Sequence, residues 1–188
     1  MAQVSTNEIK IGMKVEVDGE PYTVVFNEFV KPGKGQAFNR IKLKSVLSGK
    51  VLERTFKSGE KLELADVEEN RMRLLYKEID GGVFMDDVSF EQVSIPFTVI
   101  KDTKEWLKDD TLYTVVFYKG NPVEVIAPTF MELKIVETAP GVRGDTASGR
   151  VLKPAITETG AKVQVPIFIE EGEVVKVDTR TGDYVSRV

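Results

Sequence analysis

The chain has 188 residues, of which 41% are hydrophobic, a mean hydropathy of −0.15 and a formal net charge of −4. This composition suits a chain that buries a core, and no window reaches the roughly 18 to 20 apolar residues of a membrane-spanning helix. Because the sequence contains neither histidine nor cysteine, it excludes disulfides, thiol nucleophiles, histidine-based triads and the usual zinc sites.

Residues 1–64 predict a small barrel of SH3-like size. The N-terminus lacks the basic and then apolar pattern of a secretion signal, so we expect a cytoplasmic protein. Asp18-Gly19 and Ser48-Gly49 are turn signals between short alternating runs, and four to five strands fit this segment. The alternation of apolar and basic residues in IKLK, residues 41–44, predicts one buried and one basic face.

The stretch VKPGKGQAF, residues 30–38, joins two of the predicted strands and places Lys34 between two glycines. Pro32 stiffens the entry to this loop, and we expect both Gly33 and Gly35 to let the backbone turn tightly. A turn needs only residues that tolerate its backbone, so the lysine at the tip calls for a separate explanation.

Charge is distributed unevenly along the chain. Residues 1–64 carry 11 basic and 8 acidic side chains, residues 65–127 carry 7 and 13, and residues 128–188 carry 8 and 9. Within residues 31–61 there are nine basic and two acidic side chains. A segment of this kind attracts phosphate backbones, so we expect one end of the protein to face a polyanion.

Residues 65–127 predict five short strands and an OB-like barrel. Asp80-Gly81-Gly82 is a hairpin signal, and a further turn is predicted at Gly120-Asn121-Pro122. The stretch DTKEWLKDD, residues 102–110, is the best helical candidate and allows one or two turns. We expect its Trp106 to lie in the core.

Residues 128–188 contain four strand-like runs, FMELKIVET, KVQVPIFI, EVVKVDT and DYVSRV. Their number and spacing favour a second OB-like barrel of five short strands. Since no segment is a long amphipathic helix, we expect an all-β protein of three consecutive small β-barrels. The predicted limits of the three domains are 1–64, 65–127 and 128–188.

Several long stretches in this order resemble the bacterial elongation factor P family. They include FVKPGKGQAF and RTFKSGE in the first segment, FEQV in the second, and PGVRGDTA, KPA, TGAKVQVP and GEVVKVDTRTGDYVSRV in the third. The likeness covers nearly the whole chain. It implies a KOW- or SH3-like barrel followed by two OB-like barrels.

The resemblance also implies a function. Members of this family are not enzymes and need no cofactor, and they act as monomers away from membranes. They bind both ribosomal subunits beside the peptidyl-tRNA and rescue ribosomes stalled on consecutive prolines. The residue at the loop tip is enlarged by a modifying enzyme, and where it is a lysine, as Lys34 is, one known modification adds β-lysine to its amine.

The resemblance assigns roles to individual positions, with no catalytic residue and no metal ligand among them. The predicted site residues are Lys34 as the modified residue; Lys31, Pro32, Gly33, Gly35 and Gln36 in the loop toward the tRNA acceptor end; Arg40, Lys42, Lys44, Tyr184 and Arg187 as RNA contacts; and Gly144, Asp145 and Thr146 near messenger RNA in the exit site. By contrast, Asp86-Asp87 and Asp109-Asp110 are expected to be solvated acidic turns.

Two other classes of function remain open at this point. A general RNA-binding protein with tandem OB domains would carry surface aromatics for base stacking, whereas most aromatic residues here are in the core phase of alternating strands. An enzyme that uses paired carboxylates would place them in a recognisable motif, and the sequence shows none. Binding to free single-stranded RNA would favour the first class, and turnover of a small molecule the second.

Overall fold

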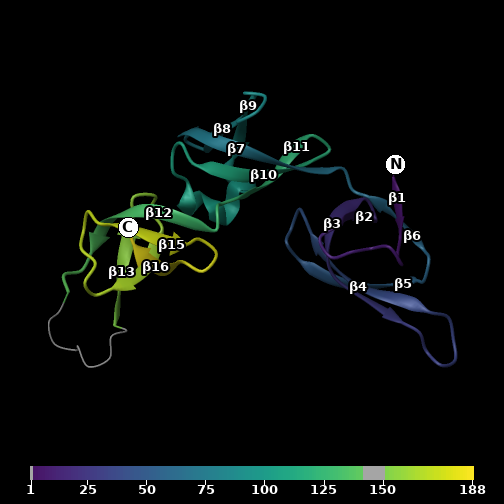
Figure 1. The fold of residues 1–188 in the computed structure, drawn as a ribbon. Helices are drawn as coiled ribbons and strands as arrows, with labels where there is room; N and C mark the ends of the chain where they lie inside the picture. Colours follow the sequence, from purple (N-terminus) through teal and green to yellow (C-terminus); the bar gives the residue numbers. More distant parts are fainter. Residues whose placement is uncertain (1, 142–150) are drawn as a thin grey trace. The chain divides into compact units, whose positions relative to one another are not determined.

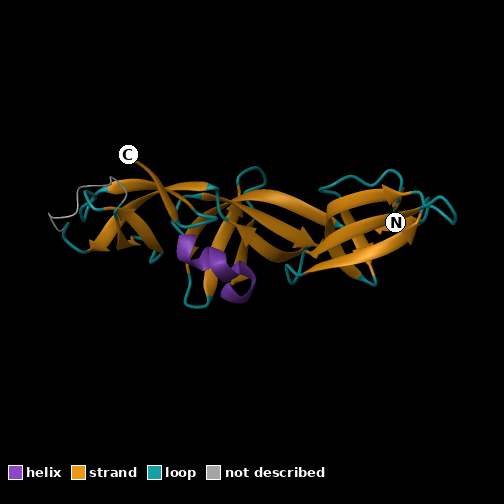
Figure 2. Cartoon of the chain, turned by 90° about the horizontal axis from the view of Figure 1, so that it is seen from below, coloured by secondary structure: helices purple, strands orange, loops and turns teal. Residues whose placement is uncertain are grey.

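The structure, a computed structural model, describes residues 2–141 and 151–188 and consists almost entirely of β-strands (Figures 1 and 2). In this part of the chain the helical residues are confined to 97–106. No helix among the described residues is long and apolar enough to cross a membrane. The all-β class predicted from the sequence is confirmed.

The N-terminal sheet contains six strands in the order β1-β6-β2-β3-β4-β5, instead of the four to five that we predicted. Its strands are β1 Gln3–Ser5, β2 Lys14–Val17, β3 Glu20–Val30, β4 Phe38–Ser45, β5 Val51–Lys57 and β6 Lys61–Leu64. Val15, Val24, Ile41 and Leu43 are fully buried at its centre. Alternate residues of a strand point to one face, so the apolar residues of β2, β3 and β4 meet in a single core.

Hairpin turns of this sheet have the backbone that the sequence predicts. Asp18 and Gly19, between β2 and β3, have φ of 52° and 79°. Positive φ at both central positions is typical of a type I′ turn, whose twist matches that of the strands. Gly49, between β4 and β5, has φ of 72°. Both predicted turns are therefore confirmed.

The second sheet has the order β11-β10-β7-β8-β9. Its strands are β7 Val67–Lys77, β8 Gly81–Asp86, β9 Gln92–Pro96, β10 Leu112–Tyr118 and β11 Asn121–Ile126. Two turns lie earlier than predicted, because Gly81 and Gly82 begin β8 and Asn121 begins β11. The second turn is centred on Lys119 and Gly120, with φ of 49° and 79°.

The helical segment also begins earlier than the predicted residues 102–110. Helix α1, Phe97–Ile100, follows Pro96 directly, and a 3-10 helix, Lys101–Trp106, continues it. Pro96 is the N-cap residue and still has the extended backbone of β9, with φ of −71° and ψ of 154°, so the helical backbone begins at Phe97. Lys101, with φ of 52°, interrupts the α-helical turn, and the chain is extended again at Leu107.

The third sheet is a closed barrel in the order β12-β13-β14-β16-β15. Its strands are β12 Phe130–Thr138, β13 Leu152–Thr157, β14 Lys162–Pro166, β15 Val174–Asp178 and β16 Asp183–Arg187. Four of the five were predicted. β13 was missed because Pro154 reads as a strand breaker, although it pairs with Gln164 of β14 in the structure.

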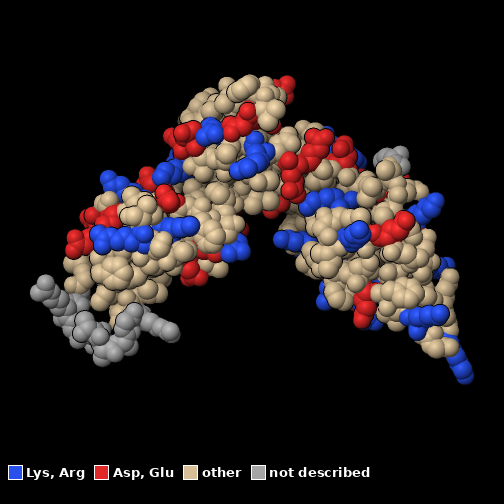
Figure 3. Space-filling model, in the orientation of Figure 1, with Lys and Arg blue, Asp and Glu red and all other residues tan. Residues whose placement is uncertain are grey.

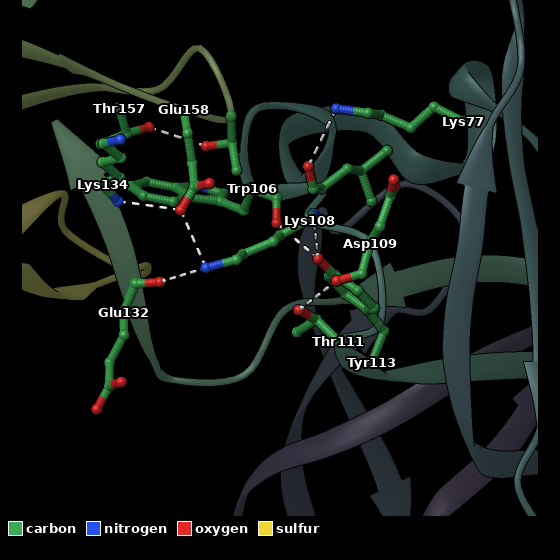
Figure 4. Close-up of polar contacts among 12 residues, drawn as sticks. Lys77, Trp106, Lys108, Asp109, Thr111, Tyr113, Glu132, Lys134, Thr157 and Glu158 are labelled. Atoms are coloured by element: carbon green, nitrogen blue, oxygen red, sulfur yellow. Dashed lines mark hydrogen bonds and ion pairs between the residues drawn. The ribbon is translucent and has the colours of Figure 1, made fainter. Parts of the chain in front are cut away.

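Residues around Trp106 join the end of the 3-10 helix to this barrel (Figure 4). Trp106 is half-buried and packs against the barrel core, so its predicted core position is confirmed in part. Lys108 Nζ lies 3.0 Å from Glu158 Oε1 and donates to the Glu132 carbonyl at 2.9 Å. Burial raises the pKa of Glu158, but the hydrogen bonds from the Lys134 N–H and the Lys108 ammonium outweigh burial and leave the pKa below its ordinary value.

Tyr113 connects the same segment to β10 and gives a testable prediction. Its hydroxyl accepts from the Lys108 N–H at 2.9 Å and donates to the Trp106 carbonyl at 2.7 Å. Replacing Tyr113 by phenylalanine leaves both groups without this partner, so we expect a loss of about 1–3 kcal/mol in the free energy of unfolding. Denaturant unfolding at neutral pH measures it.

The pH dependence of this loss provides a check. Burial raises the pKa of Tyr113 to about 12, whereas the phenol in the unfolded chain ionises near its ordinary value of about 10. The stability that a neutral Tyr113 contributes is complete below the unfolded pKa of about 10. It is lost as the pH rises from there through the folded pKa of about 12. The difference between the wild type and Tyr113→Phe should therefore narrow at high pH, and a constant difference would contradict the assignment.

The chain divides into two compact units, residues 1–70 with 115–124 and residues 71–114 with 125–188. In the first unit Tyr118 donates to Glu16 Oε2 at 3.0 Å, and Lys119 Nζ lies 3.5 Å from the same oxygen. The domain limits predicted after residues 64 and 127 fall between strands, and they stay predictions.

Candidate functional site

The candidate site is the loop of the hairpin formed by β3 and β4. These strands pair antiparallel as far as Val30 and Phe38, which close the loop of residues 31–37. β4 in turn pairs along its length with β5, and the Ser58 N–H donates to the Ala37 carbonyl at 3.0 Å. The loop is therefore attached on one side to β3 and on the other to the end of β5.

The loop is open to solvent along most of its length. Its exposed residues are Lys31, Gly33, Lys34, Gly35 and Gln36, and Pro32 is half-buried. Gly35 has φ of 129°, a backbone conformation that side chains with a β-carbon rarely adopt. Gly33 has no positive φ and open space around it, so of the two loop glycines it is Gly35 whose backbone conformation favours glycine.

Lys34 stands free in this loop. Its side chain is exposed and makes no hydrogen bond or ion pair with any residue in 2–141 or 151–188. Lys31 is also exposed and unpaired within the same described residues. A primary amine that no neighbour engages is accessible both to a modifying enzyme and to a polyanion.

The basic residues of β4 all lie on its outer face, as the sequence predicts. Arg40 has two acidic neighbours, with Glu28 and Glu53 each 3.6 Å from its guanidinium. Lys42 Nζ lies over the ring of Phe26 at 5.5 Å. Lys44 is exposed and has no polar partner among the residues that the structure describes. Figure 3 shows basic and acidic side chains mixed on the visible face of this sheet.

The predicted RNA contacts near the C-terminus have partners within the chain. Tyr184 is half-buried and packs against the core of the closed barrel. Arg187 pairs with Glu173 of the segment before β15. The predicted exit-site residues Gly144, Asp145 and Thr146 lie outside the described residues. Among the predicted site residues, the structure thus brings together those of the loop and of β4.

The two acidic turns of the second sheet are linked by one arginine. Arg73 donates to both carboxylate oxygens of Asp87, at 3.1 and 2.9 Å, and to Asp110 Oδ1 at 3.0 Å. These hydrogen bonds, first with Asp87 and then with Asp110, raise the pKa of Arg73. No cluster of acidic residues within 2–141 and 151–188 could hold a metal ion. The turns are therefore linked through Arg73, while Asp109 and Asp110 are solvent-exposed, as predicted.

Six aromatic side chains are exposed, although the sequence places most aromatic residues in the core phase of alternating strands. In the described part of the chain the exposed aromatics are Phe26, Phe29, Tyr76, Phe90, Phe130 and Phe168, whereas Tyr22, Phe56, Phe84 and Tyr113 are buried. Lysines lie over two of the exposed rings, Lys42 over Phe26 and Lys176 over Phe130.

A hydrogen-bonded pair of amides near the loop, one buried and one half-buried, was not found from the sequence. Asn39, the second residue of β4, is 2% exposed, and its Nδ2 donates to Asn27 Oδ1 of β3 at 3.1 Å. The sequence pattern could have indicated a buried polar residue here, because Asn39 precedes Ile41 and Leu43 in the inward-facing alternation of β4.

Known families match three successive parts of this chain. Residues 5–62 match the elongation factor P KOW-like domain, residues 67–125 the elongation factor P OB domain, and residues 131–187 the elongation factor P C-terminal domain. The KOW-like and OB-like architecture predicted from the sequence is confirmed by these matches and by the β topology.

Curated relatives and solved structures extend this finding. Elongation factor P 2 of Protochlamydia amoebophila is 69% identical and that of Chlamydia caviae 63% identical, over 100% of this chain and 99% of each relative. The initiation factor 5A from Methanococcus jannaschii shares the fold at 24% identity and a TM-score of 0.53, covering 67% of this chain and 97% of its own. An initiation factor 5A family protein from Naegleria fowleri does so at 15% identity, a TM-score of 0.56 and 66% and 95% coverage. The chain therefore belongs to the elongation factor P family of translation elongation factors.

Proposed function

We propose that this protein binds the ribosome beside the peptidyl-tRNA and stimulates peptide-bond formation, relieving stalling at consecutive prolines, through a Lys34 side chain that is extended after translation. Membership of the elongation factor P family supports this role. The observation that carries it is the state of Lys34, which is exposed and unpaired within the described residues although the strands on both sides of its loop are firmly hydrogen-bonded.

The chemistry of proline explains why such an arm would help. The ring of proline fixes φ, and consecutive prolines misplace the reacting end of the peptidyl-tRNA. A factor that holds the tRNA and the nascent chain in a reactive geometry lowers the entropic part of the barrier without acting as an enzyme itself. A long cationic side chain suits this task, because it passes between phosphates and donates charge-assisted hydrogen bonds.

The proposal includes the partners that the family implies. The loop, Lys31 to Gln36, would reach toward the acceptor end of the tRNA, with Lys42 and Lys44 of β4 contacting RNA nearby. Tyr184, Arg187 and the segment 144–146 would contact the tRNA and messenger RNA on the small subunit. The protein would act in the cytoplasm as a monomer, and a separate enzyme would attach β-lysine to the amine of Lys34.

The mass of protein purified from its native host tests the extension of Lys34 directly. The peptide that spans Lys34 should carry the added group, while peptides with Lys31, Lys42 or Lys44 keep their unmodified masses. Fragmentation of the spanning peptide places the group on Lys34. An unmodified mass for this peptide throughout would refute the proposed extension.

Ribosome binding should weaken as the salt concentration rises, because each phosphate contact releases counterions on binding. Lys44→Gln removes a side chain without an internal partner and should reduce the slope of log affinity against log salt by about 0.7–0.9. Arg40→Gln on the same face should reduce it less, since two glutamates already lie 3.6 Å from Arg40. Equal slopes for the wild type and Lys44→Gln, measured by filter binding, would exclude Lys44 as a contact.

The six exposed aromatic side chains favour one alternative, a general RNA-binding role by base stacking. Such a protein would bind free single-stranded RNA, and Phe29→Ala or Phe168→Ala would weaken that binding. The proposed role instead requires ribosomes that carry peptidyl-tRNA. Comparing the affinity for a single-stranded RNA with that for such ribosomes separates the two.

A further inference from the structure

The β3–β4 hairpin contains a short chain of two side-chain amides near the loop, of which Asn39 is buried and Asn27 half-buried. Asn39 Nδ2 donates to Asn27 Oδ1 at 3.1 Å, and Asn27 Nδ2 donates to the Ile9 carbonyl at 3.0 Å. Ile9 is 5% exposed and belongs to the core of the sheet. The amides therefore tie β4 to β3, and β3 to the core, close to the loop that holds Lys34.

The orientation of both amides follows from this chain of donors. Because Asn27 donates to a carbonyl, its Oδ1 faces Asn39, which must then present Nδ2. Asn39 Oδ1 is buried and has no hydrogen-bond partner within residues 2–141 and 151–188. A buried acceptor without a partner destabilises a fold. The unpaired acceptor therefore offsets part of the stability that the Asn39–Asn27 hydrogen bond contributes.

The β3 side of the hairpin end receives little other support, because β2 pairs only with residues 20–23 of β3, whereas β4 pairs with β5 up to Phe38. Asn39 pairs with Phe29 across β3, and the final pair of the hairpin is Val30 with Phe38. Phe29 is 55% exposed although it shares the inner face with Asn39, which is 2% exposed, so the core covers this end of β4 but not this end of β3. Strand ends with few buried apolar contacts open readily. Opening of these two pairs would lengthen the flexible segment before Lys34 by the end of β3, while β4 stays paired with β5.

We propose that the amide pair of half-buried Asn27 and buried Asn39 positions Lys34 by keeping the last two pairs of the hairpin closed. This inference rests on the function proposed above. A lysine at the tip of a longer loop samples a larger volume, so the entropic cost of holding it in one place is higher. A closed hairpin confines the loop before the ribosome is bound, so the entropic cost of confinement is not part of the binding step. A side chain that acts by positioning a substrate depends on this confinement.

Asn39→Leu tests the proposal, because leucine has a similar size and lacks the amide. Exchange of the Val30, Phe38 and position-39 amide hydrogens should accelerate about five- to tenfold, the equivalent of one buried hydrogen bond. Ribosome affinity should stay within about twofold, since all exposed basic residues remain. Stimulation of proline–proline synthesis at saturating factor should fall by a similar five- to tenfold. Ile41→Val, on the same inner row, lowers stability but keeps the amides, and it should leave stimulation unchanged.

A cross-link provides a readout that a merely structural role would not move. The chain has no cysteine, and Cα atoms of antiparallel partners lie within disulfide range. In the Asn39→Leu background, Val30→Cys with Phe38→Cys should restore stimulation when oxidised and lose it when reduced. Should Asn39→Leu fail to fold, Asn27→Leu removes the same hydrogen bond and takes its place.

The outcomes separate this inference from the proposed function. The proposed function is tested with the modified wild type alone. It is refuted if this protein does not stimulate proline–proline synthesis. If the wild type stimulates, and Asn39→Leu shows unchanged exchange or full stimulation, the positioning role is overturned while the function stands. Faster exchange with lost stimulation that the disulfide restores supports the positioning role.

Discussion

Replacing Lys34 by arginine should slow peptide-bond formation at consecutive prolines by at least about tenfold relative to the native modified protein. Arginine keeps the positive charge and the approximate length, but it has no primary amine that a modifying enzyme could acylate. The exposed loop should accept the change without loss of stability, because Lys34 contacts no described residue through a polar group. The measurement is the rate of synthesis on a message with consecutive prolines, with purified factor added to defined ribosomes.

Lys31→Arg is the matched control for this variant. Lys31 lies in the same loop, is exposed and lacks an internal partner within residues 2–141 and 151–188, so its replacement tests charge and geometry without touching the modified amine. We expect it to act like the wild type. Ribosome affinity of Lys34→Arg should stay near that of unmodified wild type, which carries the same charge. Rescue by Lys34→Arg equal to that of the native protein would show that charge alone suffices and would refute the positioning mechanism.

The parts of the site that follow from short-range patterns could be predicted from the sequence. The outward direction of Lys42 and Lys44 follows from the period of a strand, since Ile41 and Leu43 have to face the core. The Asp18-Gly19 turn follows from the φ values that a type I′ hairpin requires. Both depend only on residues a few positions apart.

The burial of individual side chains could not be predicted from the sequence, because it depends on how far the core extends along each strand. Alternation indicates which face of a strand a residue occupies, but not whether anything covers that face. Phe29 is in the inward phase of β3 and is still 55% exposed, because the hairpin continues beyond the core. Asn39 on the neighbouring strand is buried, with only 2% of its surface exposed. The same geometry hid the amide pair and leaves Phe29 exposed although its phase in the strand is that of a core residue.

Trp106 illustrates a second reason, which is that burial can depend on residues distant in the sequence. Its own neighbours suggested an apolar face on a helix of residues 102–110. In the structure it ends the 3-10 helix and packs against the core of the closed barrel formed by residues 130–187. No pattern within residues 102–110 could identify that partner.

At Gly81 the predicted hairpin is present, but the physical reason for the glycine differs from the one that the sequence suggests. The sequence DGG predicts a hairpin, and β7 and β8 do form one. However, Gly81 belongs to β8 and has no positive φ. A β-carbon at Gly81 would lie 2.3 Å from the Ile95 carbonyl oxygen of β9. The glycine is needed because a backbone, not a side chain, approaches it.

Gly81→Ala should therefore destabilise the second sheet by about 3 kcal/mol, because the backbone of β9 has to move to relieve the contact. β9 leads directly into helix α1, so the displacement should reach residues 97–106 and accelerate hydrogen exchange there as well as in β8. Gly33→Ala is the matched control, since Gly33 has ordinary φ and open space, and it should leave stability unchanged or slightly higher. Denaturant unfolding and hydrogen exchange measure both variants. If Gly81→Ala unfolds at the same denaturant concentration as Gly33→Ala, the close approach of β9 does not limit this position, and the glycine serves the turn alone.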